Sequence, residues 1–389
     1  MKIKRDAKKT LKKLAKGFPI LAITGPRQAG KTTLAKMAFP DKPYTSLEDI
    51  DNRSFAQEDP RGFLKQYPDG AILDEIQRTP ELFSYLQSIV DKEEKMGMFI
   101  LTGSQHFGLL SGITQSLAGR VALLQLLPFS LSELAASKKI PDTLEKLLFK
   151  GFYPPLYDRE LEVNVWAENY IQTYLEKDIY QLLKIQDISG FQKFLRLLAA
   201  YTGQLINLSS IANDCGISHN TVKAWLSALE ASYIIHLVRP HHKNFNKRLV
   251  KSPKLYFHDV SLAVRLLGIQ NPKQLVNHMN RGALFETMII NELVKSRFNY
   301  GLSSNLYFWR DQTGNEVDAL LDCGDYIEAI EIKSASTINS DFFKSLRRWY
   351  DLAEKDDENI KHKMRLIYAG EDSFSRSGIE VFSWKDLGD

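Results

Sequence analysis

The sequence has few cysteines, no long hydrophobic run and only a weak excess of positive charge. Its two cysteines, Cys215 and Cys323, provide neither a disulfide framework nor zinc-site spacing, so we expect a reducing compartment, the cytoplasm. The apolar run 18–23 is too short to cross a bilayer, and we expect no membrane partner. A formal net charge of +4 is too small to indicate nucleic-acid binding, which must be argued from local clusters.

The chain does contain enough apolar material for several buried cores. It has 389 residues, of which 44% are apolar and 25% are charged, so we expect a multidomain α/β protein. Changes in pattern indicate boundaries near residues 135, 190 and 255.

The first 135 residues alternate short apolar runs with helical patterns. Buried strands are expected at 19–23, 71–73 and 98–101, with a helix around 82–86. Strands that alternate with helices form a parallel sheet covered on both faces. Ligands of such folds bind at the carboxyl edge of the sheet, where we therefore look for the site.

A phosphate-binding loop follows the first of these strands. Residues 25–32 satisfy the pattern GxxxxGK[ST], and a helix is expected to begin directly after it. The glycines allow backbone N–H groups to close around phosphate oxygens at a helix N-terminus. Lys31 is predicted to neutralise the β- and γ-phosphates of ATP, and Thr32 to bind Mg²⁺. The predicted nucleotide-binding residues are Gly25, Pro26, Arg27, Gln28, Ala29, Gly30, Lys31, Thr32, Thr33 and Asp74.

The strand at 71–73 ends in two carboxylates, Asp74 and Glu75. Asp74 is predicted to hold Mg²⁺ through water. Glu75 is predicted to be the general base that activates the water attacking the γ-phosphate. A kinase would not need the second carboxylate, so the pair favours hydrolysis.

Two further residues are candidates for the hydrolysis step. Ser104, after the strand 98–101, is our preferred γ-phosphate sensor, with Thr102 second; an ordinary strand-to-helix turn is the alternative. Arg120 is a candidate arginine finger that would act on a neighbour's nucleotide in a homo-oligomer built through this domain. A surface arginine is the alternative.

The segment 191–255 has the pattern of a winged helix-turn-helix. A turn at Gly216 separates two short helices, the second over 220–230, and an apolar strand follows at 233–237. Such a module is expected to hold duplex DNA mostly by phosphate contact. The basic residues predicted to make these contacts are Lys223, Lys243, Lys247, Arg248 and Lys251.

Two predicted strands near the C-terminus carry a charged pattern. Asp318 lies on the first strand, and Glu331 and Lys333 lie on one face of the second, with a turn at 322–325 between them. Adjacent carboxylates can hold Mg²⁺, with Glu286 of an upstream helix as a third ligand and Lys333 orienting or deprotonating water. This is the D…ExK pattern of the PD-(D/E)XK nuclease fold.

Two unpaired carboxylates this close would repel each other. Without metal we expect Lys333 or Arg310 to compensate the charge of Asp318 and Glu331. A solvated hairpin with chance acidic residues is the alternative.

Together these motifs resemble the prokaryotic AAA-superfamily ATP-binding proteins that join a P-loop ATPase to a C-terminal domain of unknown function with a nuclease-like core. The resemblance covers nearly the whole length and implies fold and ATP use more directly than a biological role. The matching segments are 25–33, 74–78, 101–104, 117–120, 128–130, 282–286, 316–318 and 331–333.

The expected organisation is therefore an AAA-type P-loop ATPase domain over 1–135, a helical lid or connector over 136–190, a winged helix-turn-helix over 191–255 and a restriction-endonuclease-like α/β domain over 256–389. We predict an ATP-hydrolysing protein that uses ATP and Mg²⁺ and acts on or binds DNA, with metal-dependent cleavage by the last domain as a further prediction. The alternative is a non-nucleolytic ATP-dependent switch whose C-terminal half is a protein-interaction platform.

Overall fold

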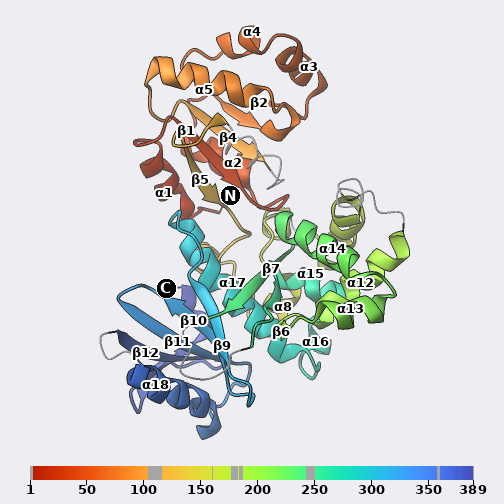
Figure 1. The fold of residues 1–389 in the computed structure, drawn as a ribbon, viewed down its shortest axis with the longest axis vertical. Coiled ribbons are helices and arrows are strands. Elements are labelled where there is room, and N and C mark those ends of the chain that lie inside the picture. Colours follow the sequence, from red (N-terminus) through yellow and green to blue (C-terminus); the bar gives the residue numbers. More distant parts are fainter. Residues whose placement is uncertain are drawn as a thin grey trace. The chain divides into compact units, whose positions relative to one another are not determined.

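A computed structural model of the chain describes residues 3–103, 116–159, 161–176, 183, 187–241, 250–356 and 360–388 (Figure 1). The chain forms two compact units. Unit one comprises Met1–Phe129, Ala231–Tyr233 and Lys295–Ser303, and unit two comprises Ser130–Glu230, Ile234–Val294 and Ser304–Asp389.

Unit one contains a five-stranded sheet in the order β2-β3-β4-β1-β5, and every paired strand is parallel to its neighbour. The strands are β1 (Ile20–Thr24), β2 (Tyr44–Ser46), β3 (Ile72–Asp74), β4 (Phe99–Gly103) and β5 (Val121–Gln125). The predicted parallel sheet is confirmed. The sequence patterns missed β2, which is only three residues long, and β5, whose residues alternate between buried and half-buried.

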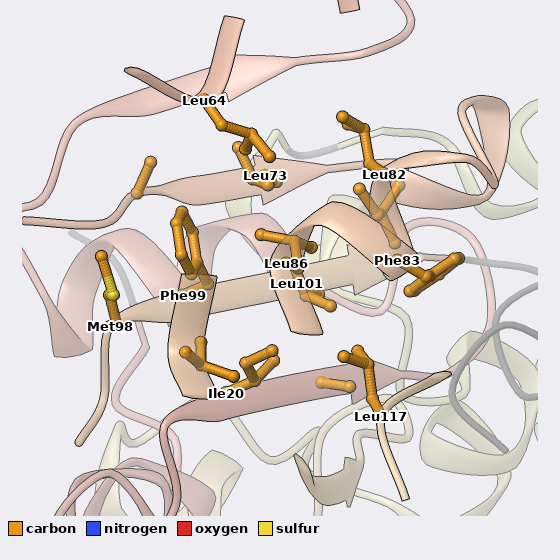
Figure 2. Close-up of a cluster of buried hydrophobic side chains, with 14 of the residues drawn as sticks. Ile20, Leu64, Leu73, Leu82, Phe83, Leu86, Met98, Phe99, Leu101 and Leu117 are labelled. Atoms are coloured by element: carbon orange, nitrogen blue, oxygen red, sulfur yellow. The ribbon is translucent and has the colours of Figure 1, made fainter. Parts of the chain in front are cut away.

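Helices cover both faces of this sheet (Figure 1). They are α1 (Ala7–Leu14), α2 (Lys31–Ala38), α3 (Ile50–Glu58), α4 (Pro60–Lys65) and α5 (Leu82–Glu93), with a 3₁₀ turn η1 (Ile76–Arg78) after β3. Figure 2 shows one face, where Leu82, Phe83 and Leu86 of α5 pack over β4 at Phe99 and Leu101. On the other face, α1 and α2 pack against alternate residues of the same strands, as a buried parallel sheet requires.

Unit two begins with helices, and short strands then alternate with further helices. Its first helices are α7 (Leu131–Ala136), α8 (Leu144–Lys150), α9 (Pro155–Asp158), α10 (Val163–Tyr170), the π-helical turn η2 (Ile171–Glu176) and α12 (Ile188–Ala200). Then follow β6 (Gln204–Leu205), α13 (Leu208–Cys215), α14 (His219–Ala231), β7 (Ile235–Pro240) and β8 (Lys254–Phe257). Gly216, between α13 and α14, has a φ of 72°, which ends α13 in the left-handed conformation that favours glycine.

The strand predicted at 233–237 begins two residues later than expected. Tyr233 has a φ of 57°, which lies outside the β region, and β7 starts at Ile235. Strand β8 lies between β7 and β6 and is antiparallel to both.

The remaining strands of unit two join the same sheet. They are β9 (Leu306–Arg310), β10 (Glu316–Asp322), β11 (Tyr326–Lys333), β12 (Lys361–Tyr368), β13 (Phe374–Arg376) and β14 (Ile379–Ser383). The sheet is mixed, with the order β13-β14-β12-β11-β10-β9-β7-β8-β6. Segments predicted to belong to separate domains thus share one nine-stranded sheet, through the parallel pairing of β7 with β9.

Helices pack against this sheet or lie beside it. They are α15 (Val260–Leu266), α16 (Pro272–Leu275), α17 (Arg281–Asn299), η3 (Ser340–Phe343), α18 (Lys344–Asp356) and η4 (Trp384–Gly388). Helix α18 contributes Leu346 and Trp349 to a core with Leu320 of β10 and Leu366 of β12. Over the ranges that the structure describes, no helix is both long and apolar enough to cross a membrane.

Candidate functional site

The loop 25–30 connects β1 to α2 in a conformation that requires glycine at both ends. Gly25 has a φ of 145° and Gly30 a φ of 93°. A Cβ atom on Gly25 would lie 2.0 Å from the carbonyl oxygen of Leu126, which is a severe clash. The sequence GxxxxGK therefore has the local geometry that its motif predicts, with α2 beginning at Lys31.

Lys31 folds back over this loop. Its Nζ donates hydrogen bonds to the carbonyl oxygens of Gly25, at 2.9 Å, and Pro26, at 2.8 Å. Burial lowers the pKa of Lys31 to about 8, although the nearby Glu75 and Asp74 carboxylates act to raise it. An added phosphate would favour the charged amine, so the site is suited to an anion.

Asp74 is the centre of a hydrogen-bonded group at the carboxyl edge of the sheet. The Thr32 hydroxyl donates to Asp74 Oδ2 at 3.0 Å, the Tyr44 hydroxyl donates to the same oxygen at 2.9 Å, and the Thr102 hydroxyl donates to Oδ1. The Thr32 hydroxyl and the buried Asp74 carboxylate offer hard oxygen ligands of the kind that Mg²⁺ prefers. Burial, followed by the charge of Asp74, raises the pKa of Tyr44 to about 12.

Sequence reasoning missed Tyr44. It lies on the short strand β2, and no motif marks it. Thr102, our second choice of sensor, contacts Asp74 from the neighbouring strand β4. The preferred sensor, Ser104, lies outside the described residues.

Glu75 adopts a strained backbone conformation directly after β3. Its φ is 55°, in the left-handed region that non-glycine residues seldom occupy. The Gln77 side chain donates a hydrogen bond to Glu75 Oε2, which holds the carboxylate in place. Strained residues of this kind cluster at functional sites, which agrees with a special role for Glu75.

Arg120 makes a bidentate ion pair with Asp91 of α5. Its Nε lies 2.5 Å from Oδ1, and its Nη2 lies 2.9 Å from Oδ2. The hydrogen bond from Arg120 holds the pKa of Asp91 below its ordinary value. In this arrangement the guanidinium is engaged within its own domain, and its action on a neighbour's nucleotide stays a prediction.

Two buried residues from distant parts of the chain support the loop and were not predicted. Arg5 donates to the carbonyl oxygens of Ala29 and Leu127, each at 2.7 Å. The hydroxyl of Tyr233 lies 2.8 Å from that of Thr24, the last residue of β1. No sequence pattern marks Arg5 or Tyr233, because folding alone brings each of them near its hydrogen-bond partners.

A second charged cluster lies in unit two, and it brings together the D…ExK residues. Strands β10 and β11 are antiparallel, and their register places Asp318 opposite Glu331. Lys333 Nζ lies 3.8 Å from Asp318 Oδ2 and 2.5 Å from Glu331 Oε1. Asp318 Oδ2 and Glu331 Oε1 therefore both lie within ion-pair distance of the same ammonium group. The backbone N–H of Ile332 also donates to Asp318 Oδ2 at 2.8 Å.

Lys254, a residue that sequence reasoning missed, enters this cluster from the first position of β8. Its Nζ lies 3.0 Å from Glu286 Oε1 and 3.8 Å from Asp318 Oδ1, and it also forms an ion pair with Glu316. The Tyr256 hydroxyl donates to Glu286 Oε1 at 2.6 Å. The expected third metal ligand, Glu286, thus faces the cluster but is held by a lysine and a tyrosine.

Burial and repulsion from a neighbouring carboxylate raise the pKa of two members of this cluster, Glu286 and Glu331. Burial, with repulsion from Asp318, raises the pKa of Glu286 to about 7 and that of Glu331 to about 8. Burial acts to lower the pKa of Lys254, but the surrounding carboxylates raise it well above its ordinary value. Lys254 lies at the centre of the group, within ion-pair distance of Glu286, Glu316 and Asp318.

Cationic groups of the chain itself face the carboxylates of the cluster. In the part of the chain that the structure describes, no group of three or more His, Cys, Asp and Glu side chains is arranged to hold a metal ion. Both oxygens of Asp318 have cationic or N–H neighbours, and within the described cluster only Glu331 Oε2 is buried without a hydrogen-bond partner. Of the two residues expected to compensate the charge, Lys333 faces Asp318 and Glu331, whereas Arg310 pairs with Glu316 at 2.8 Å.

The predicted DNA-contacting residues are only partly described. Lys223 is exposed on α14, and Lys251 is exposed just before β8. Lys243, Lys247 and Arg248 lie outside the described residues.

Three segments of the chain match known domain families. Residues 17–135 match an AAA domain. Residues 141–273 match the domain of unknown function DUF8612, and residues 281–387 match the domain of unknown function DUF4143. The phosphate-binding loop and the Asp74–Glu75 pair both lie within the AAA match, which identifies an AAA-superfamily ATPase.

Parts of the chain are also similar, at low identity, to solved structures. A Walker-type ATPase of Pyrococcus abyssi is 14% identical, with a TM-score of 0.46, over 67% of this chain and 94% of that one. AMPPCP-bound DnaA from Aquifex aeolicus is 17% identical, with a TM-score of 0.31, over 58% of this chain and 85% of that one.

Two curated proteins are related to this chain over most of its length. An uncharacterized protein of Mycobacterium tuberculosis is 30% identical over 340 residues, which cover 86% of this chain and 74% of the relative. An uncharacterized protein of Mycobacterium bovis matches with the same identity and coverage. The chain belongs to the family of these two mycobacterial proteins and, through its AAA domain, to the AAA-superfamily ATPases.

Proposed function

We propose that the protein binds and hydrolyses ATP at the loop 25–30 and uses the cycle as a conformational switch. The observation that carries the proposal is the convergence of Lys31, Thr32, Asp74 and Glu75 at the carboxyl edge of one parallel sheet. A loop of backbone N–H groups and a lysine suit the β- and γ-phosphates. Thr32 and Asp74 would hold Mg²⁺, which supplies charge neutralisation on the phosphates when bound.

Glu75 acts as the general base in this proposal. It accepts the proton of the water whose oxygen forms a bond to the γ-phosphorus while the bond to the bridging oxygen of ADP breaks. Gln77 holds Glu75 by its hydrogen bond, and Thr102 connects the neighbouring strand to Asp74. Ser104 as sensor and Arg120 as a finger in a homo-oligomer remain parts of the proposal that rest on sequence position.

Loss of the lysine provides the test of nucleotide binding. Lys31→Ala should weaken ATP binding at least ~100-fold, because it removes the charged side chain proposed to bind the β- and γ-phosphates. A fluorescent ATP analogue titrated into the full chain measures this affinity. Lys65→Ala is the matched control, since Lys65 is an exposed lysine on α4 of the same unit. Equal affinity in wild type and Lys31→Ala would refute the proposed site.

DNA is the second candidate ligand, and it would bind the segment from α12 to β8. The order helix, strand, two helices and two antiparallel strands, with β8 between β7 and β6, supports a winged helix-turn-helix. The exposed Lys223 on α14 would contact phosphate, as would Lys251 and the basic residues 243, 247 and 248. Binding should weaken steeply with salt, because phosphate contacts release counterions.

For the last domain, the charged cluster favours the non-nucleolytic alternative over metal-dependent cleavage. A PD-(D/E)XK-like core is supported by the placement of Glu286, Asp318, Glu331 and Lys333 on α17, β10 and β11. A cleavage assay with Mg²⁺ and Mn²⁺ on several DNA forms separates the two functions. If the wild type cleaves DNA and Asp318→Ala does not, the last domain is a nuclease. If the wild type binds DNA in a salt-sensitive manner but does not cleave it, the result favours a DNA-binding switch.

A further inference from the structure

We propose that Lys254 takes the place of a metal ion in the carboxylate cluster of unit two, so that this cluster binds no divalent cation. The inference deepens, and rests on, the non-nucleolytic function proposed above. It assigns the loss of metal binding to one residue outside the D…ExK pattern.

The position of the ammonium group carries the argument. Lys254 Nζ contacts Glu286, Glu316 and Asp318, which come from α17 and from alternate positions of β10. A divalent cation bound between Glu286 Oε1 and Asp318 Oδ1 would compete for the same oxygens that face this ammonium. Lys333 Nζ faces the remaining oxygen of Asp318 and one oxygen of Glu331. The carboxylates therefore already have resident cations.

The charges of the cluster are nearly balanced without metal. Two lysines and Arg310 face the carboxylates of Glu286, Glu316, Asp318 and Glu331. A metal ion added at the distance of a carboxylate ligand would lie close to a buried ammonium of the same sign, with little water to screen the repulsion. Exclusion of metal follows from this repulsion.

Lys254 cannot easily turn away to admit a metal. Only 2% of the residue is exposed, and its Nζ lies 5.7 Å from the centroid of the Phe308 ring. Its backbone is paired on both sides, with Val238 of β7 and Leu205 of β6. Moving the side chain would leave a buried ammonium without its carboxylates, which is strongly unfavourable.

The same contacts give Lys254 a structural role. The side chain connects β8 to α17 and to β10, and it is the first residue of the strand that ends the helix-turn-helix segment. The cation that a nuclease would take from solution is here supplied by the chain itself, and the cluster joins these elements instead of cutting a phosphodiester.

Mn²⁺ binding to the full chain without nucleotide tests the proposal, with electron paramagnetic resonance as the readout. All proteins carry Asp74→Asn, which removes the carboxylate proposed to hold Mg²⁺ in the nucleotide site. The parent should bind Mn²⁺ no tighter than about 1 mM, the weak limit of protein carboxylate sites, and Asp318→Asn should change nothing. Lys254→Ala should create a site at least ~10-fold tighter, which Asp318→Asn then abolishes. Lys361→Ala, at an exposed lysine of β12 in the same unit, is the control and should bind as the parent does.

Two results would overturn the proposal. One is a stoichiometric Mn²⁺ site in the parent that Asp318→Asn removes. The other is a folded Lys254→Ala protein, by circular dichroism, that gains no site. If Lys254→Ala does not fold, the comparison of the parent with Asp318→Asn alone decides. ATP hydrolysis by the wild type is measured separately, so failure of this proposal is distinguishable from failure of the ATPase proposal.

Discussion

The raised pKa of Glu331 predicts a specific pH dependence of stability in unit two. Glu331 has a pKa of about 8 in the folded chain, compared with an ordinary value of 4.5. The folded state therefore keeps a proton that the unfolded state loses, and the free energy of unfolding falls as pH rises from about 4.5 to about 8. At about 1.4 kcal/mol per pH unit, the loss attributable to Glu331 is on the order of 5 kcal/mol as an upper limit.

Glu331→Gln should remove this dependence, because glutamine carries no charge at any pH and can still accept from Lys333. The assay is denaturant unfolding followed by tryptophan fluorescence. All five tryptophans lie in unit two, so the signal reports on that unit alone. They are Trp166, Trp225, Trp309, Trp349 and Trp384.

Between pH 5 and pH 8, the free energy of unfolding should fall less for Glu331→Gln than for the wild type. The difference between the two falls should be at least ~1 kcal/mol and at most several kcal/mol. Glu371→Gln is the matched control, since Glu371 is exposed and pairs with Lys385 on the surface of the same unit. Parallel pH profiles for wild type and Glu331→Gln would refute the reasoning.

Three further substitutions have expected outcomes in unit one. Gly25→Ala should abolish ATP binding in a nucleotide titration, because its Cβ would lie 2.0 Å from the Leu126 carbonyl oxygen; normal binding would contradict the loop geometry. Tyr44→Phe should weaken Mg²⁺-dependent ATP binding by roughly threefold to tenfold, because Asp74 loses one hydrogen bond, while binding without Mg²⁺ changes little. Leu86→Ala should destabilise unit one by about 2–5 kcal/mol in urea unfolding followed by circular dichroism, because Leu86 is fully buried; a change below about 1 kcal/mol would contradict its place in the core.

Local motifs made the nucleotide site predictable from the sequence. The loop from Gly25 to Lys31 is continuous in the chain, and its glycines have the conformations that the motif implies. Asp74 and Glu75 were predictable because a buried strand ends there at the ligand-binding edge. The alternation of β11 and the turn before it likewise allowed Asp318 and Glu331 to be placed side by side.

Residues that join the sites from elsewhere were not predictable. Tyr44, Arg5 and Tyr233 contact the nucleotide site through folds of the chain that no spacing reveals. Lys254 is the most consequential of these misses, because it changes the chemistry of the cluster that contains Asp318. A lysine at the start of a strand has no pattern that distinguishes it from a surface lysine, and only the pairing of β8 with β7 and β6 buries it.

Hydrolysis of ATP by the full-length chain, compared with its Glu75→Gln variant, tests the central claim most directly. With saturating Mg²⁺ and ATP, the wild type should release phosphate, and Glu75→Gln should release it at least ~100-fold more slowly. The variant should still bind ATP with an affinity within a few-fold of wild type, because only the water-activating carboxylate is lost. Phosphate release at the wild-type rate by Glu75→Gln would contradict the account.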